Sequence, residues 1–221
     1  MSEAPAIPLS SVVATAAKLA CSAIYDPITP DVFSKIYRIG ETVCGIVLIA
    51  GTLYVVNQGT ETMAGWKADF TVEPILHPVL GNIHSGFDKN LPALVVLLIR
   101  DIAAGTPVVV CGHSKGAGEG ALLAARLKLS GINVIQTILF ACPNAGHQQF
   151  ADWMQATIPG LSFRNAPKYV PCFGDPVPME PEYPSVPPYP HTMINVIPAG
   201  MSRLLNIEWH LAEYYLNGVQ T

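Results

Sequence analysis

A serine lies at the centre of the pentapeptide Gly112-His113-Ser114-Lys115-Gly116, which has the G-x-S-x-G pattern. The apolar run 108–111 before it is typical of a buried strand, and the small residues in 117–129 favour a helix. In such a tight strand-to-helix turn, the two glycines let the backbones pass closely and the serine hydroxyl points out at the sheet edge. Short Gly/Ser patterns also arise by chance before helices. The flanking strand and helix favour the alternative, a nucleophilic Ser114.

A serine nucleophile needs a histidine to accept its proton and a carboxylate to orient that histidine. In α/β-hydrolases the chain order is serine, acid, histidine. Asp175 fits the acid best, because it follows a strand-like segment and lies in the proline-stiffened run 173–178. Two histidines follow it, His191 after a proline run and His210 at the start of a final helical pattern. The spacing favours His210, while either ring has the alternative interpretation of a structural histidine.

The negative charge that develops on an attacked carbonyl needs two backbone N–H donors, together called the oxyanion hole. Lys115 follows the nucleophile and is expected to supply one of them. Thr60 follows the strand-like run 52–57 and is the candidate for the second, although Gln58-Gly59-Thr60 also fits an ordinary turn.

Strand-like and helix-like patterns alternate along the chain, which predicts an α/β fold with a mostly parallel central sheet and helices on both faces. A packed N-terminal helix is expected within 12–24, and a proline-rich loop over 167–190. The expected strands are 43–50, 52–57, 108–111, 133–142, 161–165 and 194–197; the expected helices are 87–104, 117–129, 147–157 and 207–216.

Composition limits the class of protein. The chain has 221 residues, half of them apolar, which predicts one domain over 1–221 with a large core. The net charge of −4, without a basic stripe, argues against a nucleic-acid partner. The apolar stretch near the N-terminus is too short to span a bilayer and lacks a basic leader, so neither a membrane span nor a signal peptide is expected. Five scattered cysteines show no zinc spacing, and most are expected to be buried free thiols.

Taken together, several motifs in the same order along the chain resemble those of the class 3 lipases, the fungal triacylglycerol lipase family of α/β-hydrolases. The resemblance covers most of the chain from about Val43 onward. It rests on the strand ending in Gln58-Gly59-Thr60, on Trp66-Lys67-Ala68-Asp69-Phe70, on His84-Ser85-Gly86-Phe87, on Gly112 to Gly116, on Phe140 to Gly146, on Asp175-Pro176-Val177-Pro178, on Pro190-His191 and on Trp209-His210-Leu211.

The resemblance implies an α/β-hydrolase fold and a triad of Ser114, Asp175 and His210, and it selects His210 over His191. Three positions depart from the family pattern. Gln58 stands where arginine is usual, Lys115 where leucine is usual, and Ala117 replaces a common second glycine.

The resemblance also implies a lid over the candidate site, formed by 61–70. In a short helix, Trp66 and Phe70 would lie on roughly one face, able to cover an acyl groove or to meet lipid. An ordinary surface helix packed on the sheet explains the same pattern equally well. Phe173 is a further candidate for lining the substrate site.

The expected function is therefore hydrolysis of carboxylic esters, of the lipase or esterase type, with no metal or organic cofactor. The expected partners are a lipid or small ester substrate and a transient lipid interface. Phospholipase or acyltransferase activity on the same triad, or an inactive binding module, are the alternatives. Acyl-chain preference, compartment (cytoplasmic or secreted) and oligomeric state stay open.

Overall fold

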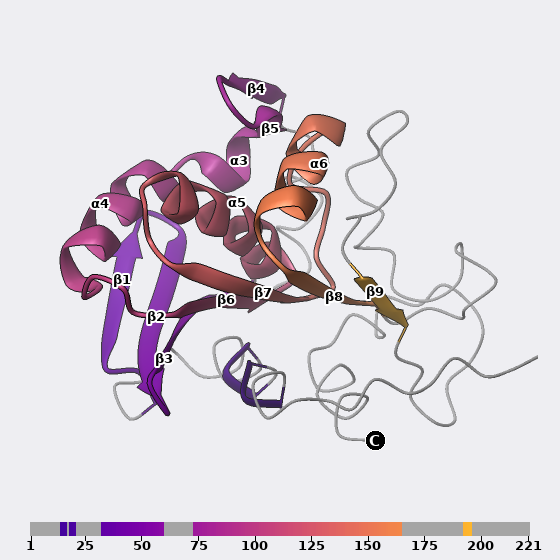
Figure 1. Ribbon diagram of the computed structural model, residues 1–221. Helices are drawn as coiled ribbons and strands as arrows, with labels where there is room; N and C mark the ends of the chain where they lie inside the picture. Colours follow the sequence, from indigo (N-terminus) through magenta and orange to yellow (C-terminus); the bar gives the residue numbers. More distant parts are fainter. Residues whose placement is uncertain (1–13, 17, 21–31, 60–72, 165–191, 196–221) are drawn as a thin grey trace, which may run out of the picture.

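The computed structural model describes residues 14–16, 18–20, 32–59, 73–164 and 192–195. Within them, a seven-stranded sheet runs in the order β1-β2-β3-β6-β7-β8-β9 (Figure 1). Its strands are β1 Lys35–Ile39, β2 Thr42–Ile49, β3 Thr52–Asn57, β6 Val108–His113, β7 Val134–Phe140, β8 Gly160–Arg164 and β9 Thr192–Asn195.

The sheet changes direction at β3. The pairs β1–β2 and β2–β3 are antiparallel, whereas every pair from β3 through β6, β7 and β8 to β9 is parallel. The central strand β6 is buried along its whole length, which explains its continuous apolar run. The expected mostly parallel sheet is confirmed.

Helices cover both faces of the sheet. α3 (Ser85–Asp88), α4 (Leu91–Asp101), α5 (Lys115–Leu129) and α6 (Gln148–Thr157) lie on one face, and helical residues 14–16 and 18–20 lie beneath the other (Figure 1). The core is accordingly divided into two clusters, one on each side of the sheet. The side chains of Leu53 and Val55 join the cluster under α4 and α5, while Tyr54 and Val56 join the other. This alternation places Asn57 on the same face as Leu53 and Val55, the face covered by α4 and α5.

Two features differ from the sequence-based expectations. The single helix expected over 87–104 is two helices, because Asn90 caps a new helix that has proline in its first turn. β1 and the small hairpin of β4 (Pro74–His77) with β5 (Gly81–His84) were not predicted. Their side chains alternate poorly between buried and exposed, so period-two patterning is weak there.

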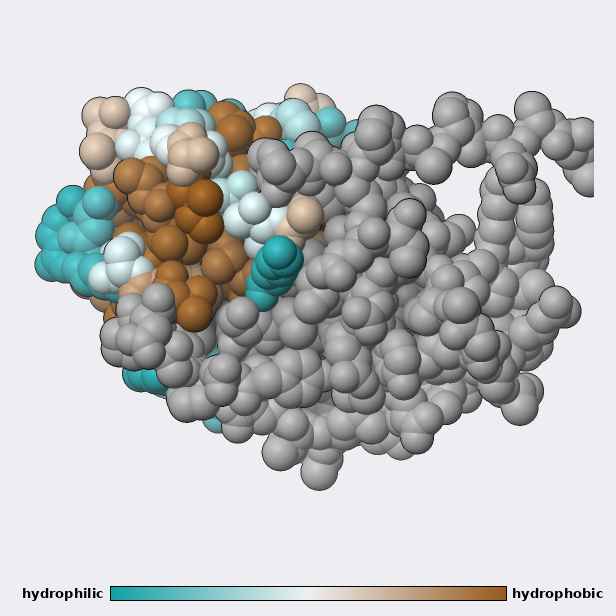
Figure 2. Space-filling view, turned by 90° about the horizontal axis from the view of Figure 1, so that it is seen from below, coloured by the Kyte–Doolittle hydropathy of each residue, from teal (hydrophilic) through white to brown (hydrophobic). Residues whose placement is uncertain are grey.

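Apolar residues gather on the face of the sheet opposite α3–α6, in the view from below (Figure 2). Half-buried side chains pack there against the second core cluster: Ile36, Val43, Val47 and Ile49. No helix in the described ranges is long and apolar enough to cross a membrane. The expected helix 207–216 and proline-rich loop 167–190 lie outside the described residues.

Candidate active site

Ser114 occupies the sharp turn between β6 and α5, as predicted. It is the N-cap of α5 and has φ 57° and ψ −129°, a conformation that a residue with a side chain rarely adopts. Its backbone is held on both sides, since its N–H donates to the Phe140 carbonyl (3.0 Å) and its carbonyl accepts from the Ala117 N–H (2.9 Å). The residue is only 3% exposed, so its hydroxyl is shielded from open solvent at the sheet edge.

The two glycines around Ser114 are required by close backbone contacts. A Cβ at Gly112 would collide with the carbonyl of Gly116. A Cβ at Gly116 would collide with the backbone at the end of β3, where Asn57 and Gln58 lie. The predicted reason for both glycines, a close approach of strand and helix, is therefore confirmed.

The end of β3 lies directly beside this turn. Asn57 pairs with Gly112 in the parallel register, and the Gln58 N–H donates to the Val43 carbonyl at 2.9 Å. Asn57 and Gln58 therefore lie next to the turn that holds Ser114. Lys115 begins α5, and its N–H belongs to the first helical turn, where a helix offers no intrahelical acceptor. The positive end of a 15-residue helix lies at the same place.

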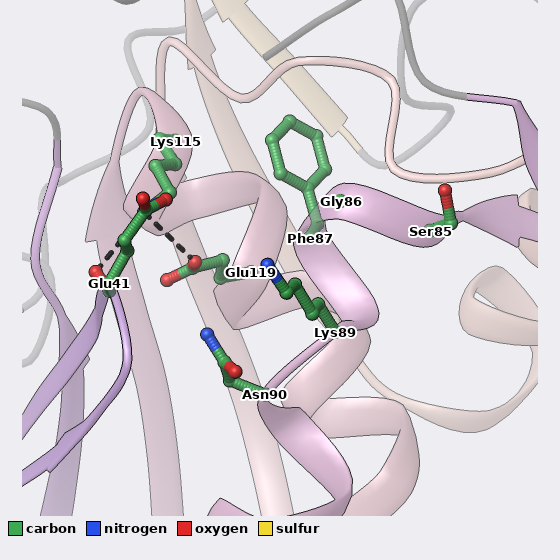
Figure 3. A pocket seen from close by; sticks show the side chains of 8 residues that line it. All are labelled: Glu41, Ser85, Gly86, Phe87, Lys89, Asn90, Lys115 and Glu119. Atoms are coloured by element: carbon green, nitrogen blue, oxygen red, sulfur yellow. Dashed lines mark hydrogen bonds and ion pairs between the residues drawn. The ribbon is translucent and has the colours of Figure 1, made fainter.

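The Lys115 side chain turns into a polar network. Its Nζ lies 3.3 Å from Glu119 Oε1 and donates to the Glu41 carbonyl at 3.2 Å (Figure 3). The Thr42 hydroxyl donates to the same Glu119 oxygen at 2.9 Å, and the Asn90 amide donates to Thr42 Oγ1 at 3.3 Å. Because Glu119 is 1% exposed, this network neutralises and hydrogen-bonds a buried carboxylate.

A pocket of about 410 Å³ adjoins this network. Figure 3 shows its walls, which come from the turn between β1 and β2, from α3 with the two residues after it, and from the first turns of α5. We call it the elbow pocket; it is lined by Glu41, Ser85, Gly86, Phe87, Lys89, Asn90, Lys115 and Glu119.

His84 lies at the start of α3 and is fully buried. Its Nδ1 accepts the Phe87 N–H at 3.2 Å, and its ring stacks on that of Phe87 with centroids 3.9 Å apart. Burial lowers the pKa of His84 from 6.5 to about 4, so the ring is neutral at pH 7. This histidine caps α3 and supports Phe87, one of the walls of the elbow pocket.

Of the predicted site residues, the structure describes Ser114 and Lys115, which are adjacent in the chain. The others lie outside the described residues, and their roles stay predictions: Thr60, Trp66, Phe70, Phe173, Asp175 and His210. Sequence reasoning missed the partners of Lys115. The spacing of Lys115 and Glu119 by four residues signals a helical ion pair. Thr42 and Asn90 are too far away in sequence for any local signal.

The fold and the elbow define the class of protein. A mostly parallel sheet with a strained serine at the carboxyl end of its central strand, followed by a helix, is the α/β-hydrolase arrangement. The family model for class 3 lipase matches residues 54–183, more than half of the chain. The chain therefore belongs to the class 3 lipase family.

Solved structures of lipases share the fold. The Rhizomucor miehei lipase in its propeptide complex is 22% identical, with a TM-score of 0.63 over 77% of this chain and 63% of that one. A triacylglycerol lipase described as having a serine protease triad at its catalytic centre is 22% identical, with a TM-score of 0.55 over 77% of this chain and 71% of that one. The mono- and diacylglycerol lipase of Aspergillus oryzae is 18% identical, with a TM-score of 0.63 over 80% and 75%.

The present chain thus spans less than two thirds of the length of the first of these lipases. Comparison with curated protein sequences gives no match.

Proposed function

We propose that this protein hydrolyses carboxylic esters of the lipase or esterase type with Ser114 as nucleophile. The observation that carries the proposal is the backbone of Ser114, held at φ 57° between two obligatory glycines at the positive end of α5. Such strain persists only where the surrounding structure enforces it, and it is concentrated at functional sites. Membership of the class 3 lipase family supports the same chemistry.

In the proposed reaction His210 accepts the hydroxyl proton of Ser114 as the oxygen attacks the ester carbonyl carbon. Asp175 holds the histidine ring in the correct tautomer and stabilises its protonated form. His210 then gives the proton to the leaving alcohol, and an acyl-serine remains. A water molecule loses a proton to His210, attacks the acyl carbon and releases the carboxylic acid, which regenerates Ser114.

The N–H groups of Lys115 and Thr60 are proposed to hold the oxyanion of both tetrahedral intermediates. The position of Lys115 at the first turn of α5 supports its part in this role, because the helix dipole favours negative charge there. Thr60 lies three residues after Asn57, whose strand ends beside the nucleophile. The mechanism requires neither a metal ion nor an organic cofactor.

The proposed substrates are acylglycerol-like or other lipid esters. Support comes from the similar structures, which include a triacylglycerol lipase and a mono- and diacylglycerol lipase. Trp66, Phe70 and Phe173 are proposed to line or cover the acyl site, with transient contact at a lipid surface.

Hydrolysis of p-nitrophenyl esters of graded chain length tests this function. Ser114→Ala is expected to lower kcat by about 10³-fold or more and to abolish labelling by a fluorophosphonate probe. Ser130→Ala is the matched control, since Ser130 ends the same helix and bonds only to the Arg126 carbonyl through its hydroxyl among the described residues. Equal activity of the wild-type protein and Ser114→Ala, or no hydrolysis and no labelling of either, would reject the proposal.

A second pair of variants tests the choice of histidine. His210→Gln is expected to lose activity as severely as Ser114→Ala, whereas His191→Gln keeps most of it. The reverse result would transfer the role of general base to His191. Product analysis with an added alcohol separates hydrolysis from acyl transfer, since an acyltransferase forms the new ester in preference to the free acid.

A further inference from the structure

The elbow pocket opens at the edge of the sheet that carries the nucleophile. β2 runs antiparallel to β3, and Cys44 pairs with Asn57, so the turn containing Glu41 lies at the end of the sheet where β3 and β6 finish. Lys115 lines the pocket and directly follows Ser114. Because consecutive Cα atoms are about 3.8 Å apart, the pocket wall begins within one residue of the nucleophile.

The walls of the pocket are polar, and their charges cancel. Two lysines, Lys89 and Lys115, face two carboxylates, Glu41 and Glu119. Asparagine and serine add uncharged hydrogen-bonding groups, and Phe87 is the one aromatic side chain among the lining residues. Such a lining offers donors and acceptors of both kinds but no net attraction for an anion or a cation. A neutral group with several hydroxyls satisfies both kinds of partner.

The structure also keeps the pocket polar and open. Lys115 is drawn to one wall by Glu119 and by the Glu41 carbonyl, and its side chain is 15% exposed. Glu119 is in turn fixed by the Thr42 hydroxyl. A long lysine side chain at this position is thereby prevented from occupying the space itself. Lys89 and Glu41 are exposed residues among those that line the pocket.

We propose that the elbow pocket is a subsite for a neutral, hydroxyl-bearing part of the ester substrate, such as the free hydroxyls of a partial glyceride. This inference rests on the proposed function, since it names the substrate class of the same serine. The volume of about 410 Å³ lies within the range of about 300–1,000 Å³ for small-molecule pockets. The protein is accordingly expected to prefer esters of polyols over esters of simple alcohols with the same acyl chain.

The test compares kcat/KM for three water-soluble hexanoyl esters: 1-hexanoylglycerol, methyl hexanoate and 1-hexanoyl-glycerophosphocholine. The proposal expects the glycerol ester to be preferred by the wild-type protein. The double variant Glu41→Met/Lys89→Met is expected to lower the ratio of glycerol ester to methyl ester by about tenfold, because two side-chain hydrogen bonds to the hydroxyls are lost.

Lys35→Met is the matched control, since Lys35 begins β1 and does not line the pocket. An unchanged ratio in the double variant would overturn the subsite, and a preference for the phosphocholine ester would overturn its neutral character. Binding of 1-O-hexylglycerol to Ser114→Ala, measured by calorimetry, separates the two proposals. Binding that weakens about tenfold in Glu41→Met/Lys89→Met supports the subsite even if no ester is hydrolysed, whereas binding that is absent or unaffected rejects it.

Discussion

Asp88 and Arg126 form a two-point ion pair that joins α3 to α5. Arg126 Nε lies 2.6 Å from Asp88 Oδ1, and Nη2 lies 2.5 Å from Oδ2. The Asp88 side chain is 5% exposed and the Arg126 side chain 19%. This pair fixes the short helix that carries Ser85, Gly86 and Phe87 against the helix that begins after the nucleophile. It therefore helps to set the shape of the elbow pocket.

Removing one partner of this pair is expected to destabilise the fold. Arg126→Met leaves a buried carboxylate without its cation, at a cost of about 2–3 kcal/mol in the free energy of unfolding. Urea denaturation at pH 7 measures it, with Lys128→Met on the same helix as the control. The double variant Asp88→Leu/Arg126→Met is expected to recover part of the loss. Equal stability of Arg126→Met and the control would contradict this role of the pair.

Glycine positions in α5 are expected to differ sharply in their tolerance of alanine. Gly116→Ala meets backbone atoms at the end of β3 and is expected to abolish activity and lower the melting temperature. The nearest atom to a Cβ at Gly120 is 3.5 Å away, in Val110, so Gly120→Ala finds room. Alanine favours a helix interior by up to about 1 kcal/mol over glycine, so Gly120→Ala is expected to be neutral or stabilising. Thermal melts of both variants check the contrast, and similar losses in both would refute it.

Lys115 is expected to be coupled to Glu119. Lys115→Leu introduces the residue usual in the family, yet it leaves the buried Glu119 carboxylate without its cation and is expected to cost about 2–3 kcal/mol. Glu119→Leu added to this variant removes the unpaired charge and is expected to restore much of the stability. A double-mutant cycle in urea measures the coupling. Additive losses would show that the two side chains stabilise the protein independently.

His84 is expected to make stability depend on pH on the acidic side of neutrality. Its pKa is lowered by burial from 6.5 in the unfolded chain to about 4 in the fold. The unfolded state therefore binds the proton first, so stability is complete above about pH 6.5 and is lost as the pH falls toward 4. The loss for this one group is about 3–4 kcal/mol, since the pKa is lowered by about 2.5 units at about 1.4 kcal/mol per pKa unit.

His84→Asn isolates this effect, because asparagine can still accept the Phe87 N–H at the helix start. Unfolding free energies between pH 7 and pH 4 are expected to fall less steeply in the variant than in the wild-type protein. Parallel slopes would mean that His84 titrates equally in the folded and unfolded states.

Much of the site region could be predicted from sequence because its signals are local. The apolar run before Gly112, the two glycines and the small residues after Gly116 all lie within about one strand, one turn and one helix, so they define the elbow without knowledge of the rest of the chain. The same holds for β2, β3, β7 and α6, whose bounds differ from expectation by only a few residues. Asn90 and Pro92 mark the break between α3 and α4. The apolar pattern continues across this break, so the sequence predicted a single helix.

By itself, the sequence determined the alternation of strands and helices, the nucleophile turn and the family. Only the tertiary structure decided what surrounds Lys115. Thr42 is 77 residues from Glu119 and 48 from Asn90, yet hydrogen bonds join Thr42 to both. Periodicity and turn chemistry report on neighbours along the chain, whereas such contacts depend on how the antiparallel β1–β2 turn returns to the end of the sheet where α5 begins. The folded chain therefore decides which polar residues meet at the nucleophile.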